Sequence, residues 1–201
     1  FALDNQSLHN QLNANQLGRM DRQNSGDEKP KFVEGHNNSG LLMDGDAWLD
    51  LGDVGRFNRS QPFTIGVWVS IPKELKNGVI FHKGVGAALY NFKGYHLALR
   101  DNKLELLMAC TAPYNAIIER STEDIPRDEW IHLGVTYDGS SKAKGYKVYL
   151  NGKKMETTVE NDNLYKDIMI GFGDAPLAGL QIGARWRGKG IGGAKVDEIM
   201  V

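Results

Sequence analysis

Apolar residues recur at every second position in short runs along the chain, and turn-forming residues separate these runs. The clearest run covers residues 63–71, in which every odd position is apolar. A second run, residues 130–137, repeats this pattern at its odd positions. Because successive side chains of a β-strand point to opposite faces, each run predicts a strand with one buried face.

Shorter runs predict further strands at residues 41–43, 47–51, 79–81, 95–100, 104–109, 147–150, 180–185 and 196–201. Three turn-forming dipeptides stand at the ends of these runs: DG at 44–45, DN at 101–102 and NG at 151–152. Asp, Asn and Gly favour the tight turns of β-hairpins. We therefore expect residues 41–43 to pair with residues 47–51. We likewise expect residues 95–100 to pair with residues 104–109.

The chain shows no sustained helical period, and its turns recur at intervals of roughly 8–12 residues, as in all-β proteins. This spacing predicts a two-sheet sandwich or a barrel. Residues 10–30 are poor in apolar side chains and rich in Asn, Gln and turn formers, so they are expected to form a flexible loop. Residues 1–201 are otherwise expected to form one domain.

Composition excludes several classes of function. The 41% of hydrophobic residues suffice for one sizeable core. With 24 Lys and Arg against 25 Asp and Glu, a nucleic-acid partner is not expected. No apolar run approaches the ~20 residues that span a bilayer. The single cysteine, Cys110, excludes an internal disulfide and is expected to be a buried, inert thiol.

The sequence also lacks the common catalytic patterns. No Gly-x-Ser-x-Gly motif is present, and no histidine stands beside Cys110. The acidic residues around 123–129 precede a predicted strand and are expected to be solvated loop carboxylates. The five histidines lack the spacing of a zinc site. The domain is therefore expected not to be an enzyme.

Several phrases in order along the chain resemble a known family: LMDG at 42–45, PFTIGVWV at 62–69, WIHLGVTYDG at 130–139, VYLNGK at 148–153, LQIG at 180–183 and VDEI at 196–199. They resemble the laminin G-like, concanavalin A-like domains of bacterial cell-surface proteins. This resemblance implies an antiparallel two-sheet jelly-roll sandwich. It also implies that residues 1–4 form a strand that pairs with residues 196–201.

Residues 138–149 and 162–164 are especially similar to the version found in large bacterial envelope proteins that also carry a cytochrome-c-like domain. The resemblance implies a location in the periplasm or at the cell surface. It also implies that other domains of a parent polypeptide are partners of this one.

Carbohydrate is the ligand that the family suggests, and sugar binding needs exposed aromatic platforms with polar neighbours. The candidate side chains are Trp48, Tyr90, Tyr95, Arg185, Trp186 and Arg187. Trp186 stands out because two arginines flank it beside a glycine-rich segment. Core packing is the alternative for each of the other aromatic residues. Trp68 and Trp130 lie in the family motifs and are expected to be structural.

Many jelly rolls of this family bind a structural calcium ion with acidic residues near the first and last strands. The resemblance places Asp4, Asp46 and Asp197 at such a site, and carboxylate oxygens suit calcium. The alternative for Asp197 is a hydrogen-bond acceptor at a strand end.

We therefore expect a non-catalytic recognition module of a bacterial envelope protein that binds a glycan. A spacer or protein-interaction domain is the alternative. A glycoside hydrolase is less expected, since the family's glycanases carry Glu-x-Asp-x-x-Glu on one strand and this sequence has no such motif.

Overall fold

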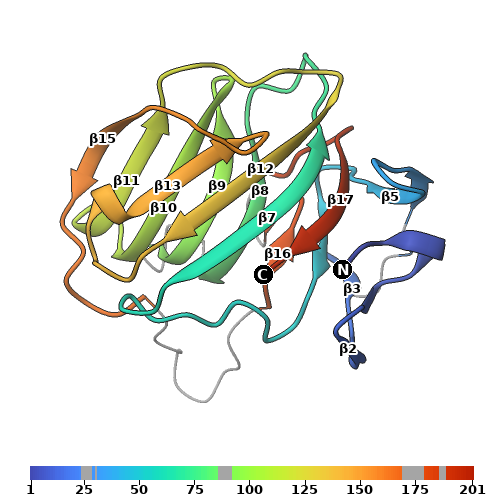
Figure 1. Ribbon diagram of the computed structural model, residues 1–201, viewed down its shortest axis with the longest axis horizontal. Helices are drawn as coiled ribbons and strands as arrows, with labels where there is room; N and C mark the ends of the chain where they lie inside the picture. Colours follow the sequence, from blue (N-terminus) through green and yellow to red (C-terminus); the bar gives the residue numbers. More distant parts are fainter. Residues whose placement is uncertain (24–28, 30, 86–91, 169–178, 186–188) are drawn as a thin grey trace.

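Two antiparallel sheets pack face to face in a computed structural model of the protein (Figure 1). The structure describes residues 1–23, 29, 31–85, 92–168, 179–185 and 189–201. Across these ranges the helical content is two short 3-10 turns, η1 (Asp4–Gln6) and η3 (Ala143–Gly145). No helix in the described part of the chain is long and apolar enough to cross a membrane. The predicted all-β sandwich is confirmed, and its two sheets are consistent with a jelly roll.

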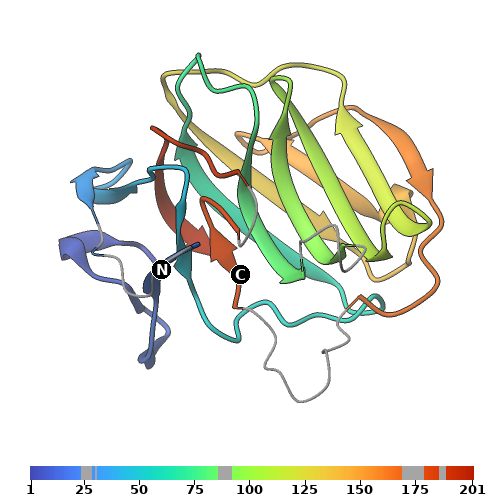
Figure 2. The ribbon, with the colours of Figure 1, turned by 180° about the vertical axis from the view of Figure 1, so that it is seen from behind.

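The larger sheet has eight strands, which face the viewer in Figure 2. Their order is β15 (Thr157–Asp162), β11 (Asn115–Ser121), β10 (Lys103–Thr111), β9 (Lys93–Arg100), β8 (Gly78–Val85), β16 (Gln181–Ile182), β6 (Ala47–Asp50) and β3 (Arg19–Arg22). The smaller sheet has seven, in the order β14 (Lys153–Lys154), β13 (Tyr146–Leu150), β12 (Trp130–Tyr137), β7 (Phe63–Ser70), β17 (Lys195–Met200), β5 (Ser39–Leu42) and β4 (Phe32–Glu34). A separate hairpin joins β1 (His9–Asn10) to β2 (Asn13–Leu17).

The hydrophobic core lies between the sheets, where the alternating apolar positions of the sequence meet. Ile65 and Val67 of β7 and Leu133 of β12 point inward from the smaller sheet and are fully buried. Leu97 and Leu106 meet them from the larger sheet. Burying apolar surface contributes about 25 cal/mol per Å², so this alternation stabilises the sandwich and fixes which face of each strand is outside.

Two of the predicted hairpins are present. Strands β9 and β10 pair from Arg100 and Lys103, and the turn residues Asp101 and Asn102 have φ of 48° and 70°. The residues 151 and 152 between β13 and β14 also have positive φ, 48° and 78°. Two consecutive left-handed residues match the right-handed twist of the paired strands, and Asn, Asp and Gly tolerate that conformation.

The predicted pairing across residues 44–45 is wrong. Strand β5 lies in the smaller sheet between β17 and β4, whereas β6 lies in the larger sheet between β16 and β3. Leu41 and Leu49 are both fully buried in the one core that separates the sheets. The turn therefore carries the chain from one sheet to the other, because each strand buries its apolar side chains from its own side.

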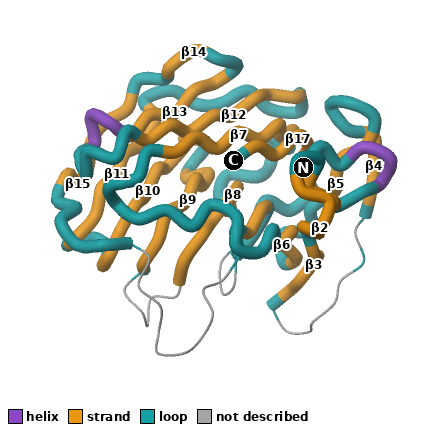
Figure 3. Tube along the Cα trace, turned by 60° about the horizontal axis from the view of Figure 1, so that its bottom comes forward, coloured by secondary structure: helices purple, strands orange, loops and turns teal. Residues whose placement is uncertain are grey.

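The first part of the expected loop at 10–30 is ordered instead, and residues 24–28 and 30 lie outside the description. Strand β3 pairs with β6 at the edge of the larger sheet and buries Met20 in the core. The expected N-terminal pairing is limited to Phe1, which exchanges two backbone hydrogen bonds of 2.9 Å with Ile199 before the chain enters η1. The two ends of the chain consequently lie side by side (Figure 3).

Candidate functional site

The predicted sugar-binding residues are only partly covered by the structure. Tyr90, Trp186 and Arg187 lie outside the described residues, so their role stays a prediction. Arg185 is half-buried, and its guanidinium carbon lies 5.3 Å from the centre of the Phe92 ring. Burial lowers the pKa of Arg185, and the nearby Arg100 charge lowers it further. Arg185 thus packs on the outer face of the larger sheet.

The prediction that Tyr95 and Trp48 bind sugar is wrong, because neither ring presents a face to solvent. Tyr95 is fully buried between the sheets beside Phe57 and Phe63, and its hydroxyl donates to the Gly55 carbonyl at 2.6 Å. Trp48 is 3% exposed. A sugar ring needs an accessible aromatic face for stacking, so both residues follow the core-packing alternative.

A cluster of rings covers the outer face of the larger sheet near Arg185. His82, Phe92 and His96 lie with ring centres 4.9 to 6.4 Å apart. His82 Nε2 donates to the Gly84 carbonyl at 3.1 Å, and His96 Nε2 donates to Glu105 at 3.0 Å. Both imidazoles are 1% exposed, and burial lowers their pKa values, so both are neutral near pH 7.

Glu105 lies at the centre of the ion pairs and hydrogen bonds on this face. Its carboxylate lies 3.1 Å from Arg100 Nε, 3.6 Å from Arg120 and 3.0 Å from His96. Burial by itself would raise the pKa of Glu105, but the His96 hydrogen bond and the Arg100 charge outweigh it and lower the pKa to about 2. A carboxylate this acidic stays ionised and does not suit a general acid.

The three predicted calcium ligands do not form one site. Asp4 accepts a hydrogen bond from the Asn38 side chain, and Asp46 pairs with Arg22 at 3.8 Å. Asp197 is fully buried and accepts backbone hydrogen bonds. Within the described ranges, no three or more His, Cys, Asp or Glu side chains are placed to hold a metal ion. The trio therefore does not fit calcium, and calcium binding by this domain stays a prediction.

The outer face of the smaller sheet carries four rings, His36, Trp68, Trp130 and His132, which we call the aromatic surface. This face of β7 and β12 is turned toward the viewer in Figure 1. Trp68, Trp130 and His132 are half-buried and lie outside the hydrophobic core, although both tryptophans were expected to be structural. His36 is exposed and stacks on Trp68, with ring centres 3.6 Å apart and planes inclined by 14°.

The other two rings surround this stack. The Trp130 ring stands at 74° to His36, with centres 6.1 Å apart. The His132 ring lies 5.4 Å from Trp68. Since His36 is exposed and Trp68 is half-buried, the imidazole forms the outer layer of the stack. The four rings together form a continuous, partly exposed platform of the kind that stacks against flat apolar ligand faces.

The loop that carries His36 is fixed by Asp197. Asn37 N donates to Asp197 Oδ2 at 3.1 Å, and Glu198 N donates to Oδ1 at 2.8 Å. A Cβ on residue 35 would lie 2.6 Å from Oδ2, so only Gly35 allows this approach. Burial raises the pKa of Asp197, although these amide hydrogen bonds lower it. Asp197 is thus a positioning residue for the aromatic surface, as its hydrogen-bond alternative predicted.

Two glycines lie under the His132 ring. Gly66 of β7 and Gly134 of β12 are paired directly across the strands. A Cβ on Gly66 would lie 3.0 Å from His132 Nε2 and 3.2 Å from Met200 Cε, while one on Gly134 would lie 3.6 Å from His132 Cε1. The imidazole therefore packs over the bare backbone of both glycines.

His132 Nε2 is the polar atom of this contact. It is buried and has no hydrogen-bond partner among the described residues. Burial lowers the pKa of His132, and the charge of His36 lowers it further. A neutral imidazole nitrogen can donate or accept a hydrogen bond, so a ligand hydroxyl that reached this nitrogen would satisfy it.

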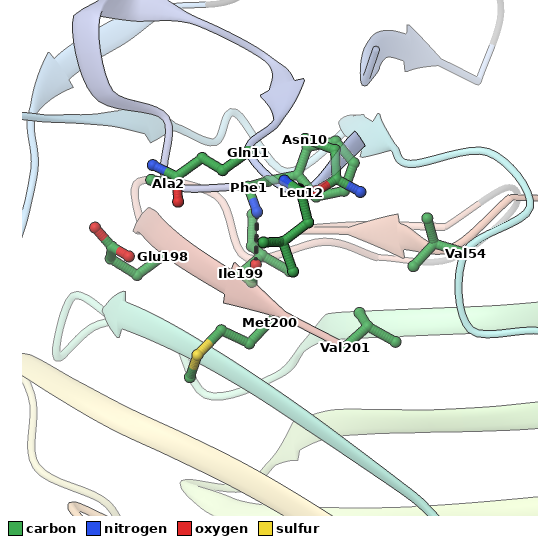
Figure 4. Close-up of a pocket in the computed structure, with 10 residues that line it drawn as sticks. All are labelled: Phe1, Ala2, Asn10, Gln11, Leu12, Val54, Glu198, Ile199, Met200 and Val201. Carbon is green, nitrogen blue, oxygen red and sulfur yellow. Dashed lines mark hydrogen bonds between the residues drawn. The ribbon is translucent and has the colours of Figure 1, made fainter. Parts of the chain in front are cut away.

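A separate cavity of about 430 Å³ lies between the two ends of the chain (Figure 4). Its lining comes from Phe1, Ala2, the β1–β2 turn, Val54 and the last residues of β17. The side chains of Leu12 and Met200 are exposed beside it, at 98% and 56%. This lining is mainly apolar, and Phe1 is the aromatic residue in it. The cavity therefore offers fewer rings for sugar stacking than the aromatic surface.

Sequence reasoning missed the aromatic surface although a signal was present. Trp68, Trp130 and His132 occupy even positions in runs whose odd positions are apolar. The alternation that buries Val67 and Leu133 thus directs these rings outward. The position of His36 had no such signal, because a loop places it.

Solved structures share the fold of this chain. Domain 4 of AbnA, a GH43 extracellular arabinanase from Geobacillus stearothermophilus, in complex with arabinotriose, aligns over 100% of this chain and 92% of its own, with a TM-score of 0.65 and 17% identity. The binding domain of Paraclostridial Mosquitocidal Protein 1 aligns over 98% of this chain with a TM-score of 0.64 and 13% identity. The botulinum neurotoxin serotype D ligand-binding domain, in complex with N-acetylneuraminic acid, aligns over 96%, with a TM-score of 0.54 and 11% identity.

The chain spans less than half of the last two structures, 46% and 45% of their lengths. At these identities the likeness concerns the fold. A comparison with curated proteins found no match. The sequence model described as the concanavalin A-like lectin/glucanases superfamily matches residues 43–201, which is most of the chain. The sequence match and the two-sheet sandwich point to the same family. The chain belongs to the concanavalin A-like lectin/glucanases superfamily.

Proposed function

We propose that this domain is a non-catalytic carbohydrate-binding module and that the aromatic surface is its binding face. One observation carries the proposal: Trp68 and Trp130 point away from the core and share a partly exposed platform with His36. Partly exposed rings on a sheet face offer the stacking surface that the apolar faces of sugar rings need.

The His132 imidazole beside the stacked rings supports a sugar ligand. It packs over the bare backbone of Gly66 and Gly134, and its Nε2 lacks a hydrogen-bond partner among the described residues. A sugar hydroxyl would supply that hydrogen bond while an apolar ring face stacks on the platform. Two structural neighbours support the same ligand class, since they were solved with arabinotriose and N-acetylneuraminic acid.

The charges of the aromatic surface favour binding over catalysis. Glycoside hydrolysis uses two carboxyl groups that flank the scissile bond. The carboxylate next to this surface, Asp197, is fully buried and accepts two backbone hydrogen bonds. It is therefore occupied in holding the loop of His36.

We further propose that the domain belongs to a bacterial envelope protein, in the periplasm or at the cell surface, beside other domains such as a cytochrome-c-like one. The resemblance of residues 138–149 to such proteins supports this context. A module that binds glycan would hold the parent polypeptide against a polysaccharide.

The test is a glycan-array screen of the purified domain, with calcium and after chelation, followed by calorimetry on the glycan that binds. Trp130→Ala should weaken binding by roughly tenfold or more, since a well-packed aromatic contact contributes about 1–3 kcal/mol. Tyr114→Ala is the control, because Tyr114 is 77% exposed and lies outside the aromatic surface.

Equal binding by Trp130→Ala and the wild type would contradict the proposed face. Failure of the folded domain to bind any glycan would contradict the function and favour a spacer or protein-interaction role. Shortened glycan products would instead identify a hydrolase.

A further inference from the structure

A second cavity, of about 160 Å³, lies at the edge of the sandwich away from the aromatic surface. Strands β13 and β14 border it from the smaller sheet, and β11 and β15 border it from the larger one. Strands β11, β13 and β15 lie at the left of Figure 1. One water occupies about 30 Å³, so a single bridging water would not fill this space, which is also smaller than a drug-sized site.

The cavity has a buried acid and a buried phenol, each with one polar atom that has no hydrogen-bond partner among the described residues. Glu119 is 3% exposed; its Oε2 accepts a hydrogen bond of 2.6 Å from the Thr157 hydroxyl, but its Oε1 has no hydrogen-bond partner among the described residues. Tyr146 is 1% exposed, and its hydroxyl also lacks a partner there. A buried polar group without a hydrogen bond destabilises a fold. Two such groups in one cavity indicate a ligand that both donates and accepts hydrogen bonds.

The remaining lining adds positive charge. Three lysines line the same cavity: Lys144, Lys147 and Lys154. Glu156 is the exposed acidic residue of the lining. Lys144 and Lys154 are exposed, and Lys147 is half-buried. The ammonium groups therefore stand toward solvent, while Glu119 and Tyr146 are buried deeper. Clustered lysines at the mouth of a cavity attract an anionic group.

We propose that this cavity binds one sugar unit that carries an acidic group, a carboxylate or a sulfate. Sugar hydroxyls donate to Glu119 Oε1 and accept from the Tyr146 hydroxyl. The acidic group of the sugar meets the lysines at the mouth. This inference rests on the proposed function in taking a glycan as the ligand, but it concerns a different surface and different residues.

The experiment compares a trisaccharide of galacturonic acid with the corresponding neutral trisaccharide of galactose, each titrated into the intact domain by calorimetry. Amide chemical shifts identify the residues that each ligand touches. The acidic trisaccharide should bind more tightly and shift amides of β11, β13 and β15. Its advantage should shrink as salt is raised, because salt screens exposed charges.

Tyr146→Phe removes one hydroxyl and keeps the buried ring, so the domain should fold and bind the acidic trisaccharide roughly tenfold more weakly. Glu119→Gln retains the side-chain size and provides a second variant. Lys154→Ala should reduce the preference for the acidic ligand. Lys153→Ala is its matched control, because Lys153 is the neighbouring exposed lysine of β14 and does not line the cavity.

Absence of binding by the acidic trisaccharide, or equal affinity of Tyr146→Phe and the wild type, would overturn the inference. Equal losses in Lys153→Ala and Lys154→Ala would also overturn it, since they would indicate nonspecific attraction. Trp130→Ala separates the two proposals. It should leave binding of the acidic trisaccharide at this cavity unchanged, whether or not the aromatic surface binds a glycan.

Discussion

The outer faces of the two sheets hold their aromatic and charged side chains in opposite ways. On the larger sheet, His82 and His96 are buried, and Glu105 is ion-paired with two arginines. On the smaller sheet, Trp68 and Trp130 remain partly exposed. Among the described residues both faces carry rings, but the imidazoles of the larger sheet are buried, whereas the tryptophans of the smaller sheet are partly exposed.

This difference separates stability from binding. A network whose charges and hydrogen bonds are paired favours the folded state, and breaking one member leaves buried charges without compensation. A partly exposed ring platform contributes less to folding and is available for a ligand. Substitutions on the larger sheet should therefore change stability, and those on the smaller sheet should change binding.

The largest effect is expected for Glu105→Ala. It leaves His96, Arg100 and Arg120 without their shared carboxylate, so the free energy of unfolding should fall by about 3 kcal/mol, as measured by urea denaturation. Glu160→Ala is the control, because Glu160 is 44% exposed and pairs with Arg120 at 3.3 Å, which predicts a loss under about 1 kcal/mol. Similar losses in both variants would contradict the central role of Glu105.

An intermediate effect is expected from pH. Burial lowers the pKa values of His82 and His96 below the ordinary 6.5, so the unfolded chain takes up protons there that the folded chain does not. Stability is then complete above about pH 6.5 and falls as pH decreases, by roughly 1 kcal/mol per pH unit for each histidine. Urea midpoints from pH 7.5 to about 5 measure this slope.

The control for the pH experiment is a histidine away from the buried cluster. His82→Gln should reduce the slope, whereas His9→Gln should leave it unchanged because His9 is exposed. A slope that His82→Gln leaves unaltered would show that other groups set the acid sensitivity.

The smallest effect on stability is expected where His132 packs over the glycines of the smaller sheet. Gly66→Ala puts a methyl group 3.0 Å from His132 Nε2 and displaces the ring, so it should weaken glycan binding severalfold while changing the unfolding free energy by less than about 1 kcal/mol. Gly134→Ala is the matched control, since its nearest contact of 3.6 Å is ordinary and leaves the ring in place. If both variants bind like the wild type, the position of His132 takes no part in binding.

The strands were predictable wherever alternation was strict. Residues 63–71 and 130–137 became β7 and β12, and the dipeptide at 101–102 forms the expected hairpin turn. The dipeptide at 44–45 misled, because a tight turn between two apolar strands fits a hairpin as well as a crossing between sheets. Only the packing of Leu41 and Leu49 from opposite sides of the core distinguishes these two arrangements.

The candidate site was less predictable than the fold. Tyr95 and Trp48 were chosen for their ring type, yet the sandwich buries both. Trp68 and Trp130 were expected to be structural, although their even positions directed them outward. The strand alternation was thus a better guide to exposure than the type of side chain, because the pleat decides the face and the type does not.

By itself, the sequence determined the fold class, the strand pattern and the inward or outward direction of side chains along β7 and β12, because these follow from local alternation and turn chemistry. Only the tertiary structure decided that His36 stacks on Trp68 and that Glu119 and Tyr146 share one cavity. Those contacts join residues far apart in the chain, and their positions depend on how the two sheets pack and on which loops they hold together.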